Sequence, residues 1–211
     1  MHEELIERVR PVTLTVERTI PLASWLRDLI PGGIRRGSTV VVNGRTQGVH
    51  TLAFSLASSA SLAGAWCAAV GFDDLGLVAV SELGVVLERL ALVPDVAPRD
   101  WVKVAGALVD SVDIILARPP AHLRLGDARR LSNRARERGA VLILVGDSSS
   151  SYGASPWGDG ADLRLSVTET RWEGPGTGEG HLQRRRLEVT AGGRGVAARQ
   201  RVHRVWMCGS A

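Results

Sequence analysis

The sequence predicts an α/β protein in which a parallel sheet is flanked by helices on both faces and is continued by a C-terminal antiparallel extension. Between residues 38 and 146, short apolar runs alternate with segments of helical spacing, which is the pattern of parallel strands joined by helices. After residue 160, two long runs of strand-forming residues follow each other with only a Gly-rich stretch between them. The 211 residues are enough for one sizeable domain with its own core.

Three parts are expected along the chain. They are an N-terminal helical segment, a core that holds the parallel sheet, and a basic β extension packed on that core, over residues 1–30, 31–165 and 166–211. In the first part, the spacing of four apolar residues places them on one helix face: Leu22, Trp25, Leu26 and Leu29.

The elements of the core follow from apolar runs and stop signals. A β-branched run over 38–44 ends in Asn-Gly, which indicates a buried strand and a turn. An Ala- and Leu-rich helix without proline follows it as far as Gly64. The later core elements are expected as strand 66–72, helix 76–90, strand 90–94, helix 99–111, strand 112–117, helix 126–139 and strand 140–146, and the extension as antiparallel strands 161–172 and 184–191.

Composition excludes several classes of protein. No stretch approaches the ~20 apolar residues that a membrane span needs, and the charged N-terminus lacks the apolar centre of a signal peptide, so we expect a cytoplasmic protein. Cys67 lies in an apolar run and is expected in the core, and the two cysteines form no metal-binding pattern. The basic residues are nearly all arginine, with Lys103 as the single lysine.

The stretch NGRTQGVHT, after the first core strand, resembles a phosphate-binding loop. Such a loop reads GxxxxGK[ST], and residues 44–51 keep Gly44 and Thr51 at the right spacing, with Gly48 between them. Val49 replaces the second glycine, which the loop uses to turn successive amides toward phosphate, so we expect a reshaped loop. His50 replaces the lysine, and a side chain with a pKa of ~6.5 is mostly neutral at pH 7.

The second half of a nucleotide site is also altered. An acid that holds magnesium through water is expected after strand 112–117, but Arg118 stands there, and a guanidinium repels the metal. Asp113 lies at the other end of that strand. Asp73 or Asp74 could activate a water, or could cap and complement the start of the next helix. We therefore expect no enzyme activity, no metal and no cofactor, with weak anion binding at Gly44 and Gly48 as a smaller possibility.

Beyond the loop, the sequence resembles RecA-like proteins, and within them the ImuA-type proteins of the actinobacterial branch. The resemblance rests on LIPGGIRRGSTVVVNGRTQGVHTLAFSLASSAS, AWCAAVGFDDLGLVAVSELGVVLERLALVP, DIILARPP, ARRLSNRARERGAVLILVG and RRRLEVTAGGRG, and it covers about residues 22–206. It implies a RecA-like sheet. Val49, His50 and Arg118 depart from the nucleotide machinery of active RecA proteins.

The resemblance implies a role in DNA-damage-induced translesion synthesis and mutagenesis, part of the SOS response. The expected partners are an ImuB-like Y-family polymerase relative and, through it, an error-prone C-family polymerase, with DNA as a further candidate ligand and a nucleoid-associated location. Residues 1–20 could support self-association. Two alternatives remain: a RecA-like ATPase or recombination mediator, and a cell-division inhibitor on the same superfamily fold.

A basic C-terminal segment is the candidate surface for DNA or a partner. Seven arginines and one tryptophan carry it: Arg184, Arg185, Arg186, Arg194, Arg199, Arg201, Arg204 and Trp206. Clustered arginine is typical of a polyanion site, but it also fits an acidic protein partner or a solvated strand face. The loop over 147–160 offers Tyr152 and Trp157 for base stacking. The arginines of helix 126–139 are expected on its solvent face, and Trp25, Trp66, Trp101 and Trp172 in packing roles.

Overall fold

The computed structural model describes residues 19–44, 47–146, 157, 160–174, 184–194 and 200–208. Its main sheet has eight strands in the order β10-β9-β8-β3-β7-β6-β4-β5. The strands are β3 (Thr39–Gly44), β4 (Cys67–Val70), β5 (Leu90–Val93), β6 (Ile114–Ala117), β7 (Val141–Val145), β8 (Leu163–Glu173), β9 (Arg184–Gly193) and β10 (Arg201–Cys208). The helices are α2 (Ser24–Arg27), α3 (Val49–Leu62), α4 (Leu77–Glu82), the 3₁₀ helix η1 (Leu87–Arg89), α5 (Trp101–Val109) and α6 (Leu125–Arg138).

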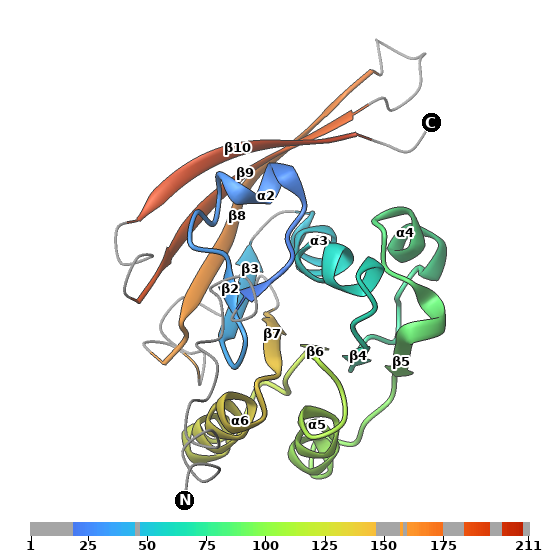
Figure 1. Cartoon of the computed structure of the whole chain (residues 1–211), viewed down its shortest axis with the longest axis vertical. Coiled ribbons are helices and arrows are strands. Elements are labelled where there is room, and N and C mark those ends of the chain that lie inside the picture. The colour runs from blue at the N-terminus through green and yellow to red at the C-terminus, as the bar shows by residue number, and fades with distance from the viewer. Residues whose placement is uncertain are drawn as a thin grey trace, which may run out of the picture.

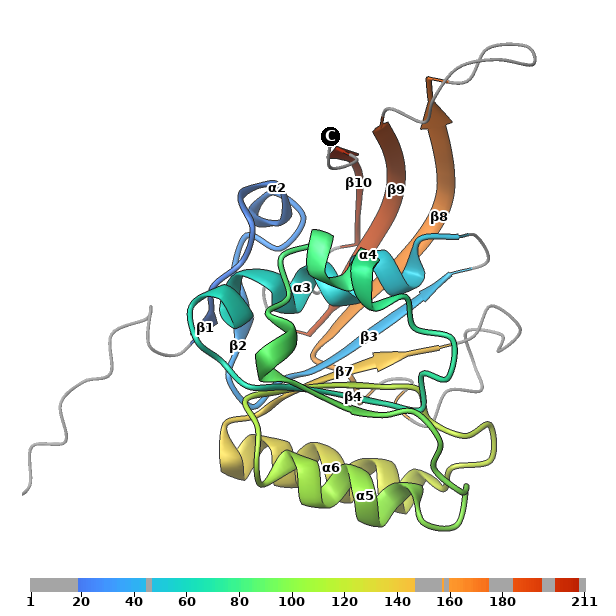
Figure 2. The same cartoon turned by 90° about the vertical axis from the view of Figure 1, so that its right-hand side faces the viewer.

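The sheet lies between two layers of helices, as Figure 2 shows, with α5 and α6 on one face and α2, α3 and α4 on the other. Strands β8, β3, β7, β6, β4 and β5 all pair in parallel. In the central strands β4, β6 and β7 every side chain is apolar and buried, because helices cover both faces of the sheet there. The expected α/β architecture with helices on both sides of a parallel sheet is confirmed.

Two cores hold the layers together. Helix α3 is buried along most of its length, with Leu52, Phe54 and Leu56 fully inaccessible to solvent. Helix α6 is amphipathic: Ala128, Leu131 and Ala135 are buried against the sheet, and its arginines lie on the opposite, exposed side, as expected. Cys67 is buried in β4, as expected, and loss of hydration raises the pKa of its thiol to about 11.

The structure corrects the prediction at two helices. The helix expected within residues 22–30 is shorter, a single turn at α2, although Leu26 and Leu29 are buried as its spacing predicted. The helix expected over 76–90 splits into α4 and η1, since Gly84 between them adopts a φ of 93°. Residues 1–18, the greater part of the expected N-terminal helical segment, lie outside the described residues.

A two-stranded antiparallel sheet that the sequence did not predict lies beside α2. It pairs β1 (Thr19–Ile20) with β2 (Ile34–Arg35). Each strand is only two residues long, which is too short for a period-2 pattern to be visible in the sequence.

The C-terminal extension continues the main sheet. Strand β8 pairs in parallel with β3 and antiparallel with β9, and β10 completes the edge by antiparallel pairing with β9. In Figure 1 these three strands rise past α2 and beyond the rest of the sheet. The expected boundary at residues 165 and 166 falls inside β8, which runs through it with a bulge between Val167 and Glu169. Within the described ranges, no helix combines the length and the apolar character that crossing a bilayer requires.

Helices α5 and α6 are joined by an ion pair whose strength depends on pH. Asp110, at the end of α5, accepts hydrogen bonds from Arg134 Nε at 2.8 Å and Arg138 Nε at 3.0 Å. The hydrogen bond from Arg134 is the main reason why the pKa of Asp110 is lowered to about 2.

We predict that Asp110→Asn lowers the thermal midpoint at neutral pH and that this difference narrows in acid. A carboxylate with a lowered folded pKa stabilises the fold above its unfolded pKa, ~3.9, and this contribution is lost as the pH falls toward about 2. Thermal melts of both proteins between about pH 5 and pH 2 test it. Asp95→Asn, at an exposed position, is the control. A difference that stays constant across this range would contradict the role of Asp110.

Candidate functional site

The candidate phosphate loop lies between β3 and α3, at the carboxyl ends of the parallel strands, as the sequence predicted. Gly48 precedes the helix with a φ of 111°, and Val49 is the first helical residue and is buried. None of the described residues other than glycine has a positive φ, so Val49 avoids the strain that a phosphate-loop glycine position would impose on it. Residues 45 and 46 lie outside the described part of the loop.

Arg185 of β9 reaches into this loop from the side. Its Nη1 donates a hydrogen bond of 3.2 Å to Thr51 Oγ1, the hydroxyl that a working loop offers to magnesium. Its guanidinium lies 4.9 Å from the centre of the Trp172 ring, a cation–π contact. A Cβ on Gly48 would come within 2.9 Å of Arg185 Nη2, so the loop and the guanidinium are in close contact. The side chain is half-buried, and loss of hydration lowers its pKa.

Arg118, the residue that directly follows β6, contacts the same site from the other side. Its Nη2 lies 2.9 Å from His50 Nε2, and its guanidinium pairs with Asp73 and Asp74 at 3.3 Å each. The aromatic ring of Phe72 lies 5.2 Å beneath it. The two aspartates therefore face Arg118 and not α4, whose start has Gly76 without a side-chain cap. The alternative in which one of these aspartates caps the next helix is therefore wrong.

Two arginines thus contact the last two positions of the motif, His50, which replaces the lysine, and Thr51, which is retained. His50 is turned toward Arg118 and Thr51 toward Arg185, so both side chains are engaged within the protein. Within the described ranges, no group of three His, Cys, Asp or Glu side chains is arranged to hold a metal ion. Asp113 lies at the start of β6, as expected, where it binds Arg36 at 3.0 Å and the amide of Trp66. The arrangement can attract an anion but offers little to a magnesium ion.

The arginines of the C-terminal segment lie in three places. Arg185 enters the loop, and Arg194 and Arg201 line a pocket at the opposite end of the sheet. Arg184, Arg186 and Arg204 lie with Trp206 on the outer face of β9 and β10, as the strand register shows. Arg199 lies outside the described residues.

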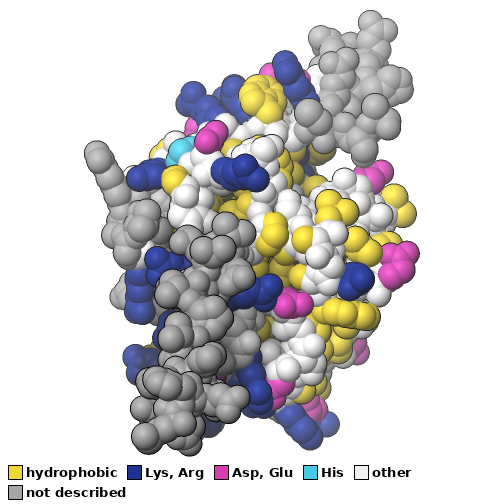
Figure 3. All heavy atoms as spheres, viewed as in Figure 1, with side chains coloured by type: hydrophobic (Ala, Val, Ile, Leu, Met, Phe, Trp, Pro, Cys, Tyr) yellow, Lys and Arg dark blue, Asp and Glu magenta, His cyan; other side chains and the backbone are white. Residues whose placement is uncertain are grey.

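The outer face of β8–β10, defined by Arg184, Arg186, Glu188, Arg204 and Trp206, carries both signs of charge. Arg184 pairs with Glu173 of β8 at 2.7 Å, and Arg204 pairs with Glu188 at 3.1 Å. Arg184 and Arg186 also stack on Trp206, at 4.6 and 5.6 Å from its ring, and the ring is 39% exposed. Figure 3 shows basic side chains gathered over this region with acidic ones among them. This face is a mixed-charge surface with an aromatic centre.

The tryptophans differ in part from expectation. Trp157, a candidate for base stacking, is buried: its Nε1 donates to Ser132 Oγ at 3.0 Å and its ring packs edge-on against Trp101. Its stacking role is therefore wrong, and Tyr152 lies outside the described residues. Trp101 is in the core as expected, whereas Trp66 and Trp172 are 49% and 43% exposed.

The contact of Arg185 with the phosphate loop was not predicted from the sequence, although the residue pattern of β9 indicates on which face of the strand Arg185 lies. Along β9, Arg185 has the same parity as Leu187, Val189 and Ala191, and these three residues are buried. Period-2 alternation therefore puts Arg185 on the inner face and its two neighbouring arginines on the outer face. The sequence alone does not say which element lies against that inner face.

We predict that Gly48→Ala destabilises the fold, by about 1–3 kcal/mol, because a Cβ at a φ of 111° is strained and would approach Leu187 and Arg185 within 3 Å. Urea unfolding at neutral pH measures the change. Gly126→Ala in α6 is the matched control, since a Cβ there meets nothing within 4 Å. It should be neutral or stabilising by up to about 1 kcal/mol. Equal stability of the wild type and Gly48→Ala would mean that the loop is not packed against β9.

Comparison with known proteins places the chain in a family. The family model of the MT3502 N-terminal domain matches residues 28–150. The uncharacterized protein Rv3395c of Mycobacterium tuberculosis is 30% identical over 204 residues, which cover 91% of this chain and 93% of that protein. The crystal structure of flagellar accessory protein FlaH from Methanocaldococcus jannaschii, a RecA-like protein, matches with a TM-score of 0.55 and 14% identity over 83% of this chain and 86% of that chain, so the RecA-like fold is confirmed. The chain therefore belongs to the MT3502 N-terminal domain family and has a RecA-like fold.

Proposed function

We propose that this RecA-like protein is a non-catalytic accessory factor of DNA-damage-induced translesion synthesis. It acts by binding an ImuB-like Y-family polymerase relative and, through it, an error-prone C-family polymerase, in association with the nucleoid. DNA is its second candidate ligand. The choice of pathway rests on the resemblance of the sequence to ImuA-type proteins.

The observation that carries the non-catalytic part of the proposal is the contact between Arg185 and Thr51. A hydrogen bond from a charged donor contributes about 1.5–3 kcal/mol, and stacking on Trp172 adds about 0.5–1 kcal/mol at an exposed site. The cost of a cation near the positive end of α3 is about 0.3–1 kcal/mol. Burial of the guanidinium, whose Nε has no hydrogen-bond partner among the described residues, opposes these gains. The structure shows the contact in place, and a phosphate group with magnesium would have to displace it.

The outer face of β8–β10 is the proposed contact surface for the partner. Tryptophan and arginine are the residue types that most often dominate the energy of protein interfaces, and Trp206 lies between Arg184 and Arg186. Two of the arginines on this face are already paired with glutamates, which weakens it as a site for a polyanion. This balance favours a protein partner over DNA at this surface.

Deletion of the C-terminal strands would not test this surface. Leu187 and Val189 of β9 are fully buried and Val205 of β10 is 6% exposed, so a truncation at residue 181 would open the core. Substitutions on the outer face leave these residues in place. The side chains to change are Arg184, Arg186 and Trp206, all of which point away from the core.

We predict that Arg184→Ser, Arg186→Ser and Trp206→Ala together reduce capture of an ImuB-like polymerase relative from DNA-damaged cells by at least about tenfold, because a central aromatic anchor typically contributes 2 kcal/mol or more. The tagged full-length chain serves as bait, and quantitative mass spectrometry measures the captured protein. Arg129→Ser with Arg130→Ser, on the exposed side of α6, is the matched loss of two arginines. Both variants should keep the wild-type circular dichroism spectrum.

Equal capture by the two variants would exclude the outer face as the partner surface, and absence of any polymerase relative from the wild-type capture would contradict the proposed pathway. The same variants titrated with labelled single-stranded DNA separate the two ligands. If the outer face binds DNA, the slope of affinity against salt should fall by about 0.7 for each phosphate contact that is removed.

A further inference from the structure

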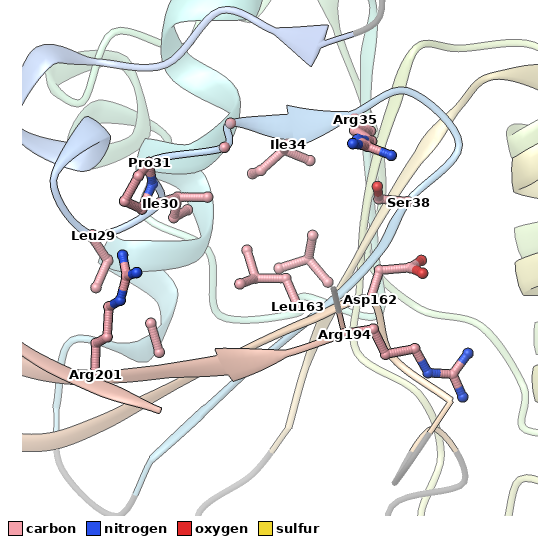
Figure 4. Close-up of a pocket in the computed structure, with 14 residues that line it drawn as sticks. Leu29, Ile30, Pro31, Ile34, Arg35, Ser38, Asp162, Leu163, Arg194 and Arg201 are labelled. Carbon is pink, nitrogen blue, oxygen red and sulfur yellow. The ribbon is translucent and has the colours of Figure 1, made fainter. Parts of the chain in front are cut away.

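A pocket of about 340 Å³ lies at the end of the sheet opposite to the phosphate loop. It is bounded by Ser38 and Leu163, at the starts of β3 and β8, whereas the loop follows the end of β3. Figure 4 shows Arg201 of β10 directed toward Leu29 and Pro31 at one end of the pocket, and Arg35 at the other end. The pocket is thus separate from the residues discussed above as nucleotide machinery.

The pocket combines an apolar floor with unbalanced positive charge. Leu29, Ile34 and Leu163 are buried residues that line it. Arg35 and Arg201 are exposed at its rim, and neither has a carboxylate partner within the described part of the chain. An apolar surface flanked by arginines is complementary to a ligand that carries aliphatic groups and carboxylates together.

Asp162 is the one acid among the described residues that line the pocket, and its carboxylate is already engaged. Asp162 Oδ2 accepts a hydrogen bond of 2.9 Å from the amide of Thr39, and Oδ1 lies 3.6 Å from Arg136 Nη2. Arg194 also lines the pocket. The charge of Asp162 is therefore offset within the fold, and the arginines of the rim determine the sign of the potential at the pocket.

The pocket extends from the start of β3 to Arg201 of β10, so it reaches the edge of the sheet, and this position favours a peptide over a small molecule. Arg201 begins β10, the last strand of the sheet, whose outer edge pairs with no strand among the described residues. An extended peptide can lie along such an edge and place alternate side chains into a neighbouring pocket. The volume lies near the lower end of the range for ligand sites, about 300–1,000 Å³, which suits one or two anchoring side chains.

We propose that this Arg35–Arg201 pocket binds an extended acidic peptide of a protein partner, with an aliphatic side chain on the apolar floor and neighbouring carboxylates on Arg35 and Arg201. The inference deepens the adaptor function proposed above and rests on it for the choice of a protein ligand. It identifies a second contact surface, on the opposite side of β9 and β10 from Trp206.

An array of 12-residue peptides that combine Asp or Glu with Leu or Ile, probed with the full chain, tests this proposal. The same peptides with Lys at every acidic position form the reference set. Acidic peptides should bind and lysine peptides should not. In fluorescence anisotropy with the strongest acidic peptide, Arg35→Ser with Arg201→Ser should weaken binding at least about tenfold, because two charge-assisted contacts are lost. Arg129→Ser with Arg130→Ser should bind like the wild type.

Three results would overturn the proposal: no acidic peptide binds, the two double variants bind equally, or inorganic phosphate or hexanoate displaces the peptide at similar concentration. The last result would identify a small-anion site in place of a peptide site. The array contains no polymerase sequence and no DNA, so its failure is distinguishable from failure of the capture experiment. A positive result would stand even if the captured partner were not a polymerase relative.

Discussion

The contact between the Arg185 guanidinium and the Thr51 hydroxyl is the interaction on which the account of this protein depends. It exists because β8 and β9 extend the main sheet past β3, which brings a side chain of the C-terminal extension to the start of α3. Gly48 permits the approach, since any Cβ there would meet Leu187 and Arg185 within 3 Å. The phosphate loop and the C-terminal strands are therefore one structural unit, and a substitution in either one alters the packing of the other.

In β9 and β10 of this extension, arginines at odd positions lie on the inner face of the sheet and arginines at even positions lie on the outer face. Residues on the inner face of β9 and β10 meet the loop or line the Arg35–Arg201 pocket, and residues on the outer face surround Trp206. A single basic stretch of sequence thereby supplies an internal contact, a pocket rim and a mixed-charge surface. The second guanidinium near the loop belongs to Arg118, directly after the core strand β6, and it contacts His50, Asp73 and Asp74. Guanidinium groups therefore contact the end of the loop from two sides, Arg118 at His50 and Arg185 at Thr51.

Much of this fold could be read from the sequence, and the limits have physical causes. The parallel strands were predictable because residues buried on both faces give short continuous apolar runs, and Arg118 was placed opposite the loop because it follows such a run. The split of α4 from η1 depends on one glycine, Gly84, whose positive φ no apolar pattern reports. The burial of Trp157 depends on a partner 25 residues away, Ser132. The role of Arg185 needed the order of the strands, because alternation gives a face but not the element that lies against it.

Titration of the wild type with Mg-ATP tests the central claim most directly, by calorimetry at neutral pH with Thr51→Ala measured in parallel. Arg118 and Arg185 already bind the side chains of His50 and Thr51. The account therefore predicts no saturable binding of Mg-ATP up to about 1 mM, a Kd at which the binding free energy is about −4 kcal/mol. It also predicts no difference between the wild type and Thr51→Ala. Saturable binding at micromolar concentration that is lost in Thr51→Ala, accompanied by release of phosphate, would contradict it and would make the protein a working ATPase.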